Sequence, residues 1–292
     1  MIAAPRIALV GFGEVGQTVA ADLQGAAITD ITAWDRLFPC ATSAPSRAAA
    51  VNRRVRVAPG MAAAVADRAL VISAVTAGEC LAAAREAATA LRPGTVFFDM
   101  NSVAPATRAA AAAAIESAGG RYVEAAVMSP IGAKRIASPM LLGGPYARDF
   151  EPQARALGFT GVRVFDATVG RASAAKMCRS VMIKGLEALL TESLVAARHH
   201  RVEDTVLESL RDLFPHEDWE RIAAYMISRS LQHGRRRAEE MREAASTVAE
   251  AGIEPWMSAA CARRQEWAAG RAPAGDRAPL ARMLDAILTE HA

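Results

Sequence analysis

Short, mostly apolar runs alternate with alanine-rich segments through the first 168 residues of the chain. Apolar runs without a polar alternation are typical of parallel strands that are covered on both faces. The segments between them repeat apolar residues at helical spacing, so strands and helices are expected to alternate as in a doubly wound α/β sheet. Strands are expected at residues 6–10, 28–34, 55–58, 69–75, 95–99, 122–128, 139–142 and 162–165.

A different pattern begins at Gly170, after which no strand pattern appears. Residues 170–200 lack proline and repeat apolar residues at three- and four-residue steps, which predicts one long helix. We therefore predict two domains: residues 1–168 form an α/β domain, and residues 169–292 form an all-α domain that includes this interdomain helix. Further helices are expected at residues 203–214, 216–251 and 256–269, with a last one ending at His291.

A glycine-rich turn follows the first predicted strand at once and leads into a helix. In this pattern the first glycine makes the tight turn, the second lets the backbone approach a pyrophosphate, and the third lets helix and strand pack closely. The alternative is a glycine turn in an unrelated α/β unit. We predict a Rossmann-type dinucleotide-binding domain whose phosphate loop comprises Gly11, Phe12, Gly13, Glu14, Val15 and Gly16.

The second predicted strand ends on an acidic residue, Asp35, which lies 19 residues after Gly16. A carboxylate at this place accepts hydrogen bonds from the adenosine ribose and would repel the 2′-phosphate of NADP. The next residue, Arg36, leaves the alternative open, because a guanidinium can clamp a 2′-phosphate or stack on the adenine. We predict NAD as the cofactor, with NADP as the alternative.

Small residues, most of them polar, follow three other predicted strands. Ligands of doubly wound sheets bind at the carboxyl ends of the strands, so these residues are candidates for contacts with the cofactor or the substrate. The alternative role of each polar residue is to cap the helix that follows. The candidates for cofactor contacts are Val75, Thr76 and Asn101, and those for substrate contacts are Ser102 and Ser129.

The helix at residues 170–200 carries a polar stripe on one side. Lys176, Ser180, Lys184 and Glu187 follow one another at spacings of four, four and three residues. The chain has three lysines against 31 arginines, and an amine, unlike a guanidinium, can lose its proton near neutral pH when it is desolvated. Lys176 is therefore either a functional amine or a lysine whose ammonium reaches the solvent.

The apolar residues of this helix predict that much of it is buried. Met182, Leu189 and Val195 lie on faces other than the main apolar stripe and would extend the buried surface around the helix. The main stripe is formed by Ile183, Leu186, Leu190 and Leu194.

Composition and charge exclude several classes of protein. A chain that is 52% hydrophobic and 22% charged can build a sizeable core, and a net charge of +3 is too small to imply nucleic-acid binding. Its cysteines are isolated, which predicts neither a metal site nor a disulfide framework. No apolar run reaches the roughly 18 residues that span a bilayer, and the first residues show no signal-peptide pattern. We expect a cytoplasmic protein that binds neither nucleic acid nor membranes.

Four sequence blocks between residues 5 and 195 carry a resemblance to a known family: GFGEVG, DMNSVAP, AAVMSPIGA with LLGG, and GRASAAKMCRS. The chain resembles the β-hydroxyacid dehydrogenases, which include 3-hydroxyisobutyrate and 6-phosphogluconate dehydrogenases, and within them a bacterial branch with its own helical C-terminal domain. The resemblance implies that Lys176 is catalytic, that Ser129 binds the substrate, and that Asn101 and Ser102 lie beside the nicotinamide. It also implies a homodimer formed through the helical domain.

Two departures from the family pattern concern the substrate. Pro130 and Ile131 follow Ser129 where the family usually has two glycines, and Pro130 has no N–H to offer a substrate carboxylate. Ser180 stands where the family has asparagine, so a hydroxyl with a shorter reach would contact the substrate. Both departures indicate a substrate unlike those of the best-known members.

These observations predict an NAD(P)-dependent oxidoreductase that transfers a hydride between a nicotinamide and the hydroxyl or carbonyl group of a hydroxy-acid-like substrate. Lys176 would take the hydroxyl proton in oxidation and return it in reduction. Two alternatives remain. One is an imine reductase on the same fold, although such relatives generally lack the lysine, and the other is a non-catalytic dinucleotide-binding dimeric protein.

A basic segment interrupts the predicted helix at residues 216–251. The residues expected to share one face of this helix are His233, Arg236, Arg237 and Glu240. Gly234 costs about 1 kcal/mol inside a helix unless something must approach closely. We predict that His233 and Arg236 bind the substrate, where a guanidinium would replace the anion-binding N–H that Pro130 lacks. The alternative is a solvated helix face held by pairs of arginine and glutamate.

Overall fold

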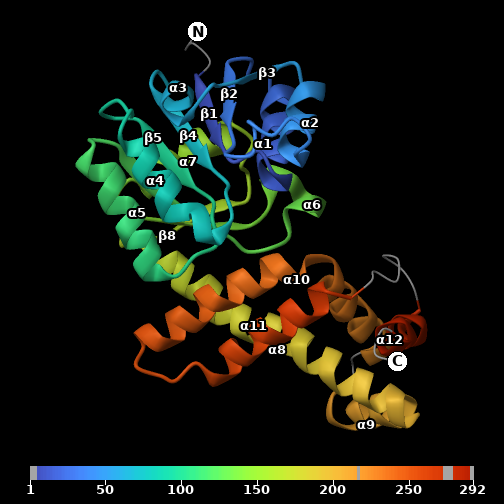
Figure 1. Cartoon of the computed structure of the whole chain (residues 1–292). Helices are drawn as coiled ribbons and strands as arrows, with labels where there is room; N and C mark the ends of the chain where they lie inside the picture. The colour runs from blue at the N-terminus through green and yellow to red at the C-terminus, as the bar shows by residue number, and fades with distance from the viewer. Residues whose placement is uncertain (1–4, 216–217, 272–278, 290–292) are drawn as a thin grey trace. The chain divides into compact units, whose positions relative to one another are not determined.

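The computed structural model describes residues 5–215, 218–271 and 279–289 (Figure 1). The chain divides into two compact units, Met1–Lys176 and Met177–Ala292. His216 and His291, at which predicted helices begin and end, lie outside the described residues.

The first unit is built around an eight-stranded sheet with the strand order β3-β2-β1-β4-β5-β6-β7-β8 (Figure 1). Neighbouring strands pair in parallel, except that β6 and β7 are antiparallel. The chain order reverses between β1 and β4, and ligands of such sheets bind at the carboxyl ends of the strands at this point. The strands are β1 (Ile7–Val10), β2 (Ile31–Trp34), β3 (Val55–Val57), β4 (Leu70–Ser73), β5 (Val96–Asp99), β6 (Arg121–Val127), β7 (Met140–Gly143) and β8 (Val162–Asp166).

Helices cover both faces of this sheet. They are α1 (Glu14–Gly25), α2 (Ala44–Val51), α3 (Met61–Val65), α4 (Cys80–Ala88), α5 (Pro105–Ser117), α6 (Ile131–Lys134) and α7 (Ala147–Ala156), with 3-10 turns η1 (Ala77–Glu79) and η2 (Arg135–Ala137). Ile7 and Leu9 of β1 join a core with α1, α2, α6 and α7, whereas Ala8 and Val10 join a core with α3, α4 and α5. This division follows from the alternation of side chains along a strand, and it explains why both faces of β1 are apolar.

The described residues of the second unit form helices and the segments that connect them, without a strand. The helices are α8 (Arg171–His200), α9 (Glu203–Leu213), α10 (Trp219–Glu250), α11 (Trp256–Ala269) and α12 (Leu280–Thr289). The first turns of α8 belong to the first unit and the remainder to the second. Leu194 of α8, Ile227 of α10 and Leu284 of α12 meet in the largest apolar cluster of this unit. In the described parts of the chain, no helix combines the length and apolarity that a membrane crossing requires.

The predicted fold class, an α/β sheet domain followed by an all-α region, is confirmed. The apolar pattern alone does not predict α7, because its sequence is polar and includes Pro152, yet Phe150 and Ala154 bury one face of it. The expected burial of Met182, Leu189 and, on the main apolar stripe, Ile183 is wrong: they are 73%, 56% and 37% exposed. Periodicity identifies a helix, but only packing decides how many of its faces are covered.

Candidate active site

At two positions of the loop between β1 and α1, the backbone conformation or the close approach of other backbone atoms requires glycine. Gly11 has φ +90°, and a Cβ there would lie 2.4 Å from the backbone oxygen of Ala74. A Cβ on Gly16 would lie 2.1 Å from the backbone oxygen of Gly11. Only glycine allows the left-handed conformation at the first position and the close approach of backbone at both.

Gly13, the middle glycine of this loop, faces open space. A Cβ on Gly13 would meet no heavy atom of the described residues within 4 Å. Gly13 is the N-cap of α1, and within the described structure no side chain caps the helix there. A phosphate can approach this open face and accept hydrogen bonds from the first N–H groups of the helix. The loop therefore fits the pyrophosphate of a dinucleotide, with Phe12 buried, Val15 half-buried and Glu14 exposed.

Asp35, at the end of β2, is tied to the glycine loop. Its carboxylate accepts hydrogen bonds from the backbone N–H groups of Phe12 at 2.7 Å and Leu37 at 2.9 Å. The neighbouring Arg36 donates to the carboxylate of Glu79 at 2.7 Å. The predicted ribose-binding carboxylate therefore lies next to the loop, and the competing guanidinium is paired with an acidic residue that follows β4.

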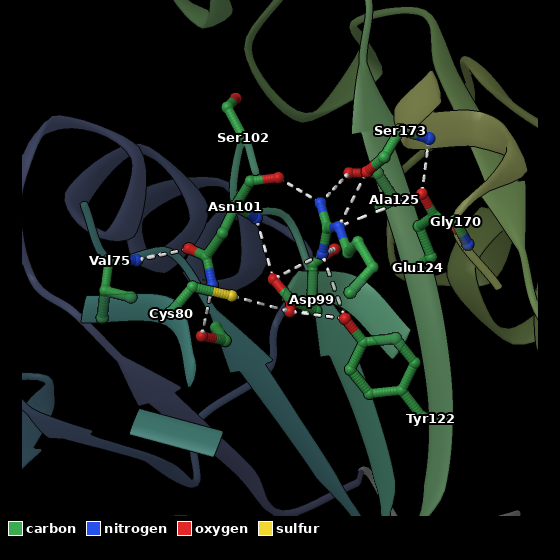
Figure 2. A network of polar contacts seen from close by, with 12 residues as sticks. Val75, Cys80, Asp99, Asn101, Ser102, Tyr122, Glu124, Ala125, Gly170 and Ser173 are labelled. Atoms are coloured by element: carbon green, nitrogen blue, oxygen red, sulfur yellow. Dashed lines mark hydrogen bonds and ion pairs between the residues drawn. The ribbon is translucent and has the colours of Figure 1, made fainter. Parts of the chain in front are cut away.

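Asn101 connects the carboxyl ends of β4 and β5 (Figure 2). Its side-chain oxygen accepts a hydrogen bond from the backbone N–H of Val75 at 2.7 Å, and its amide group donates to Ser73 at 3.0 Å. Asn101 is almost fully buried. Thr76, the next residue after Val75, is the N-cap of η1 and uses no side-chain hydrogen bond for capping within the described structure.

Two of the predicted substrate and catalytic residues lie together in the first unit. The amine of Lys176 donates a hydrogen bond to the hydroxyl of Ser102 at 2.5 Å. Ser102 follows β5, and Lys176 lies on α8, so the pair joins segments 74 residues apart in the sequence. Lys176 therefore reaches the edge of the sheet that also carries the glycine loop, since β1, β4 and β5 are parallel.

Ser129 follows β6 and has a buried hydroxyl. Among the described residues, its Oγ has no hydrogen-bond partner. A buried hydroxyl without a partner costs free energy unless a ligand or water satisfies it, so Ser129 is available to a ligand. Pro130 is the N-cap of the short helix α6 and offers no N–H beside it.

The remaining predicted substrate residues lie in the second unit. Ser180 accepts a hydrogen bond from the amine of Lys184 at 3.1 Å, and that amine pairs with Glu240 at 2.7 Å. On α10, His233 is half-buried and Arg236 is exposed, with the Arg236 Nε 4.0 Å from the Glu240 carboxylate. Lys184 is therefore an ion-pair residue of this unit.

Gly234 is explained by packing between α10 and α11. A Cβ on Gly234 would lie 2.3 Å from the backbone oxygen of Gln265. The close approach that the glycine permits is therefore made by a neighbouring helix. Next to Arg236, Arg237 is the arginine that points inward: it is buried and pairs with the buried Glu187. The sequence did not distinguish these two arginines.

One buried arginine of the first unit is absent from the predicted site residues, and its polar partners are labelled in Figure 2. Arg108 of α5 is fully buried and pairs with the carboxylate of Asp99 at 2.7 Å. Asp99 also accepts a hydrogen bond from the Tyr122 hydroxyl at 2.7 Å, and Glu124 lies 3.9 Å from the Arg108 Nε. Burial acts to lower the pKa of Arg108, but Asp99, Tyr122 and Glu124 raise that pKa well above its ordinary value. Arg108 therefore stays charged.

A signal for Arg108 is present in the sequence. Residues 108, 111, 112 and 115 share one face of α5, and the other three are buried apolar residues, Ala111, Ala112 and Ile115. A single arginine on an otherwise apolar helix face must find buried acceptors. The pattern indicates burial, whereas the partners come from distant segments and cannot be read from it.

The fold and the glycine loop define a dinucleotide-binding protein, and comparison with known proteins assigns it to a family. Residues 6–170 match the NAD binding domain of 6-phosphogluconate dehydrogenase, and residues 197–268 match a domain of unknown function (DUF1932). The chain belongs to the first of these families, whose match covers more than half of it. The predicted membership of the β-hydroxyacid dehydrogenases is confirmed.

Solved structures similar to this chain agree with the assignment. A conserved hypothetical protein from Sinorhizobium meliloti is 34% identical, with a TM-score of 0.74 over 99% of this chain and 97% of that one. A conserved protein of unknown function, described as structurally similar to 3-hydroxyacid dehydrogenases, is 31% identical, with a TM-score of 0.67 over 90% of this chain and 96% of its own. Mycobacterium tuberculosis 3-hydroxyisobutyrate dehydrogenase with L-serine shares the fold at 20% identity, with a TM-score of 0.72 over 99% of both chains.

The family and these structures support a nicotinamide-dependent oxidoreductase of the 3-hydroxyacid dehydrogenase type. Among the residues that the structure describes, no group of three or more His, Cys, Asp or Glu side chains is arranged to hold a metal ion.

Proposed function

We propose that this chain is an NAD(P)-dependent dehydrogenase or reductase that acts on the hydroxyl or carbonyl group of a hydroxy-acid-like substrate. The observation that carries the proposal is the hydrogen bond between Lys176 and Ser102. It brings one of only three lysines of the chain to the end of the sheet where the glycine loop lies. A general acid or base must lie within hydrogen-bond reach of the proton that it transfers, and Lys176 meets this requirement for a ligand bound beside Ser102.

Each residue of the site has a separate role in this proposal. A bound nicotinamide dinucleotide supplies or accepts the hydride. Lys176 gives a proton to the substrate oxygen in reduction and takes it in oxidation. Ser102 orients the amine by accepting its hydrogen bond, and Ser129, whose hydroxyl has no partner among the described residues, donates to the substrate.

The variant Lys176→Ala tests the role of the lysine. We expect kcat to fall by about 10²–10⁴-fold, because the proton then has no positioned acceptor or donor, while the affinity for the dinucleotide stays near that of the wild type. Lys176→Arg should be similarly inactive, since a guanidinium keeps its proton. Lys134→Ala, at an exposed lysine of α6, is the matched control and should retain activity. Wild-type turnover in Lys176→Ala would remove the lysine from the mechanism.

We further propose NAD as the preferred cofactor. The charge of Asp35 disfavours a 2′-phosphate, and Arg36 is paired with Glu79, which a 2′-phosphate would have to displace. We expect kcat/KM to favour NAD by about tenfold or more, which corresponds to about 1.4 kcal/mol. Glu79→Gln should narrow this preference by releasing Arg36, whereas Glu86→Gln, an exposed residue of α4, should not. A tenfold preference of the wild type for NADP would contradict the proposal.

The substrate is proposed to be acidic, with contacts from Ser180, His233 and Arg236. Arg236→Ala should raise KM for an acidic substrate about 10–100-fold, because a hydrogen bond to a charged group contributes roughly 1.5–3 kcal/mol to binding. Arg235→Ala, at the adjacent exposed arginine, is the control. A screen of hydroxy acids, their aryl and phosphorylated analogues, and cyclic imines with both cofactors would identify the substrate class. Turnover of imines alone would instead favour an imine reductase, and cofactor binding without turnover would favour a non-catalytic dinucleotide-binding protein.

A homodimer formed through the helical unit is also proposed. Several large apolar side chains of this unit are exposed to solvent, and such surface commonly marks a protein interface. These residues are Met182, Leu189, Tyr225, Ile253, Trp256 and Met257. Size-exclusion chromatography with light scattering should give twice the mass of the 30.8 kDa chain, and Trp256→Asp combined with Leu189→Asp should shift the protein toward the monomer. A wild-type monomer at micromolar concentration would refute the proposal.

A further inference from the structure

Arg108 donates hydrogen bonds to both segments that carry the Lys176–Ser102 pair, and its partners Asp99, Asn101 and Ser173 are labelled in Figure 2. Its Nη1 donates to the backbone oxygen of Asp99 at 3.0 Å, and its Nη2 donates to the backbone oxygen of Asn101. The Asp99 carboxylate, which pairs with Arg108, also accepts from the backbone N–H of Asn101 at 2.9 Å. The guanidinium therefore holds the turn that leads directly into Ser102.

The same guanidinium holds the start of α8. Arg108 Nε donates to the hydroxyl of Ser173 at 3.0 Å. The neighbouring Glu124 accepts hydrogen bonds from the backbone N–H groups of Gly170 at 2.7 Å and Ser173 at 2.5 Å. Ser173 precedes Lys176 by three residues, so one helical turn separates the anchored position from the amine.

We propose that Arg108 is a positioning residue that sets the separation of the Lys176 amine and the Ser102 hydroxyl by anchoring both segments to one guanidinium. The planar fork of a guanidinium fixes the directions of several hydrogen bonds at once, whereas an ammonium acts as a compact point charge. The turn before Ser102 and the start of α8 are distant in sequence, so their relative position depends on an anchor that both share. The consequence for turnover rests on the proposed function, but the anchoring itself does not.

The alternative is that Arg108 only stabilises the fold, and a second buried arginine of the same unit allows the two to be separated. Arg68 precedes β4, at the amino-terminal edge of the sheet, and pairs with Asp30 at 2.6 Å. Like Arg108, it is buried. Arg68→Lys therefore makes the same chemical change at the edge opposite to the site and serves as the matched control for Arg108→Lys.

The test measures amide hydrogen exchange and steady-state kinetics of the full chain at a temperature where both variants are folded. Arg108→Lys should speed exchange in peptides covering residues 100–106 and 170–176 by at least about tenfold, as the loss of a hydrogen bond to a charged group implies. Its kcat should fall about 100-fold, the expected effect of a misplacement of about 1 Å, while KM for the cofactor stays near the wild-type value. Arg68→Lys should leave both peptides and kcat unchanged.

The possible outcomes separate the anchoring by Arg108 from the proposed function. Unchanged exchange in both peptides of Arg108→Lys, or equal losses of kcat in the two variants, would overturn it. A wild type without turnover would refute the proposed function alone, because exchange still reports on the anchoring. If Arg108→Lys does not fold, Glu124→Gln replaces it: exchange should then speed up at residues 170–176 and not at residues 100–106, and kcat should fall by a smaller factor. If exchange in Glu124→Gln changed by the same factor in both peptides, that result would also count against the proposal.

Discussion

Each unit of the chain buries a guanidinium against a carboxylate, and the two pairs differ in how completely their polar atoms are satisfied. In the first unit, Arg108 pairs with Asp99 and donates to the backbone and to Ser173. In the second unit, Arg237 pairs with Glu187. Arg108 lies on an otherwise apolar buried face of α5, and the buried residues of α10 around Arg237 are mostly apolar. The difference between the two pairs therefore arises from the polar groups that surround each arginine.

The surroundings decide how burial affects the charges. For Arg108, acidic and hydroxyl groups outweigh burial and raise its pKa well above the ordinary value. For Arg237, burial lowers the pKa despite Glu187 and Glu240, and burial raises the pKa of Glu187 despite Arg237 and Lys184. In the described residues the Arg237 Nε and the Gln265 Oε1 also lack hydrogen-bond partners.

A buried ion pair therefore needs further hydrogen bonds in addition to its mutual attraction. Desolvation of two charges can exceed the Coulomb gain unless additional donors and acceptors satisfy the remaining polar atoms. Arg108 has such acceptors on several strands and loops, which makes it suitable as a rigid anchor. Arg237 and Glu187 have fewer and are expected to tolerate replacement better.

The largest expected effect is that of Asp99→Asn. This substitution leaves the fully buried Arg108 without its main counter-charge, and breaking a buried pair in this way costs about 3–5 kcal/mol in the free energy of unfolding. Urea unfolding monitored by hydrogen exchange of peptides from β5 and β6 would measure it for the first unit. A loss below about 1 kcal/mol, the usual value for an exposed pair, would show that Asp99 and Arg108 are not coupled as described.

Gly234→Ala is expected to have the next largest effect. Its Cβ would lie 2.3 Å from the backbone oxygen of Gln265, so α10 and α11 would have to move apart, at about 1–3 kcal/mol. Gly185→Ala on α8 is the control, because a Cβ there meets no described atom within 4 Å, and it should stabilise the helix by up to about 1 kcal/mol. Equal effects of the two variants on thermal unfolding would contradict the close helix contact.

Glu187→Gln makes the same carboxylate-to-amide change as Asp99→Asn and should cost less. Burial already disfavours the charged form of Glu187, so the amide loses only about 1 kcal/mol of hydrogen bonding to Arg237. The same urea experiment, with peptides from α8 and α10, would measure the difference between the two units. If Glu187→Gln proves as costly as Asp99→Asn, the contrast between the two pairs is wrong.

The smallest expected effect is a pH dependence of the loss in the free energy of unfolding that Glu187→Gln causes. In the unfolded chain Glu187 ionises near its ordinary pKa of 4.5, whereas in the folded chain the raised pKa keeps the proton bound to higher pH. Unfolding between these two pKa values releases a proton, so the contribution of Glu187 to stability is complete below pH 4.5 and is lost as the pH rises through the folded value. The cost of Glu187→Gln should accordingly shrink with rising pH, and a cost that grows would contradict the raised pKa.

Local sequence signals predicted the elements and the glycine loop because their causes are local. A buried parallel strand needs consecutive apolar residues, and the turn at Gly11 needs a residue that tolerates φ +90°. The polar helix α7 escaped this reasoning because few of its residues are buried. The exposed Met182 and Leu189 show the converse, because an apolar side chain does not by itself imply burial.

The buried ion pairs show most clearly what cannot be predicted from the sequence alone. The residue types, the single arginine on the apolar face of α5 and the scarcity of lysines were all readable from the chain. Which carboxylates meet Arg108, and which of Arg236 and Arg237 turns inward, depends on segments that approach one another only in the folded protein. Ser173 lies 65 residues from Arg108, and Glu187 lies 50 residues from Arg237. Because the free energy of a buried charge depends on its whole surroundings, these choices belong to the tertiary structure.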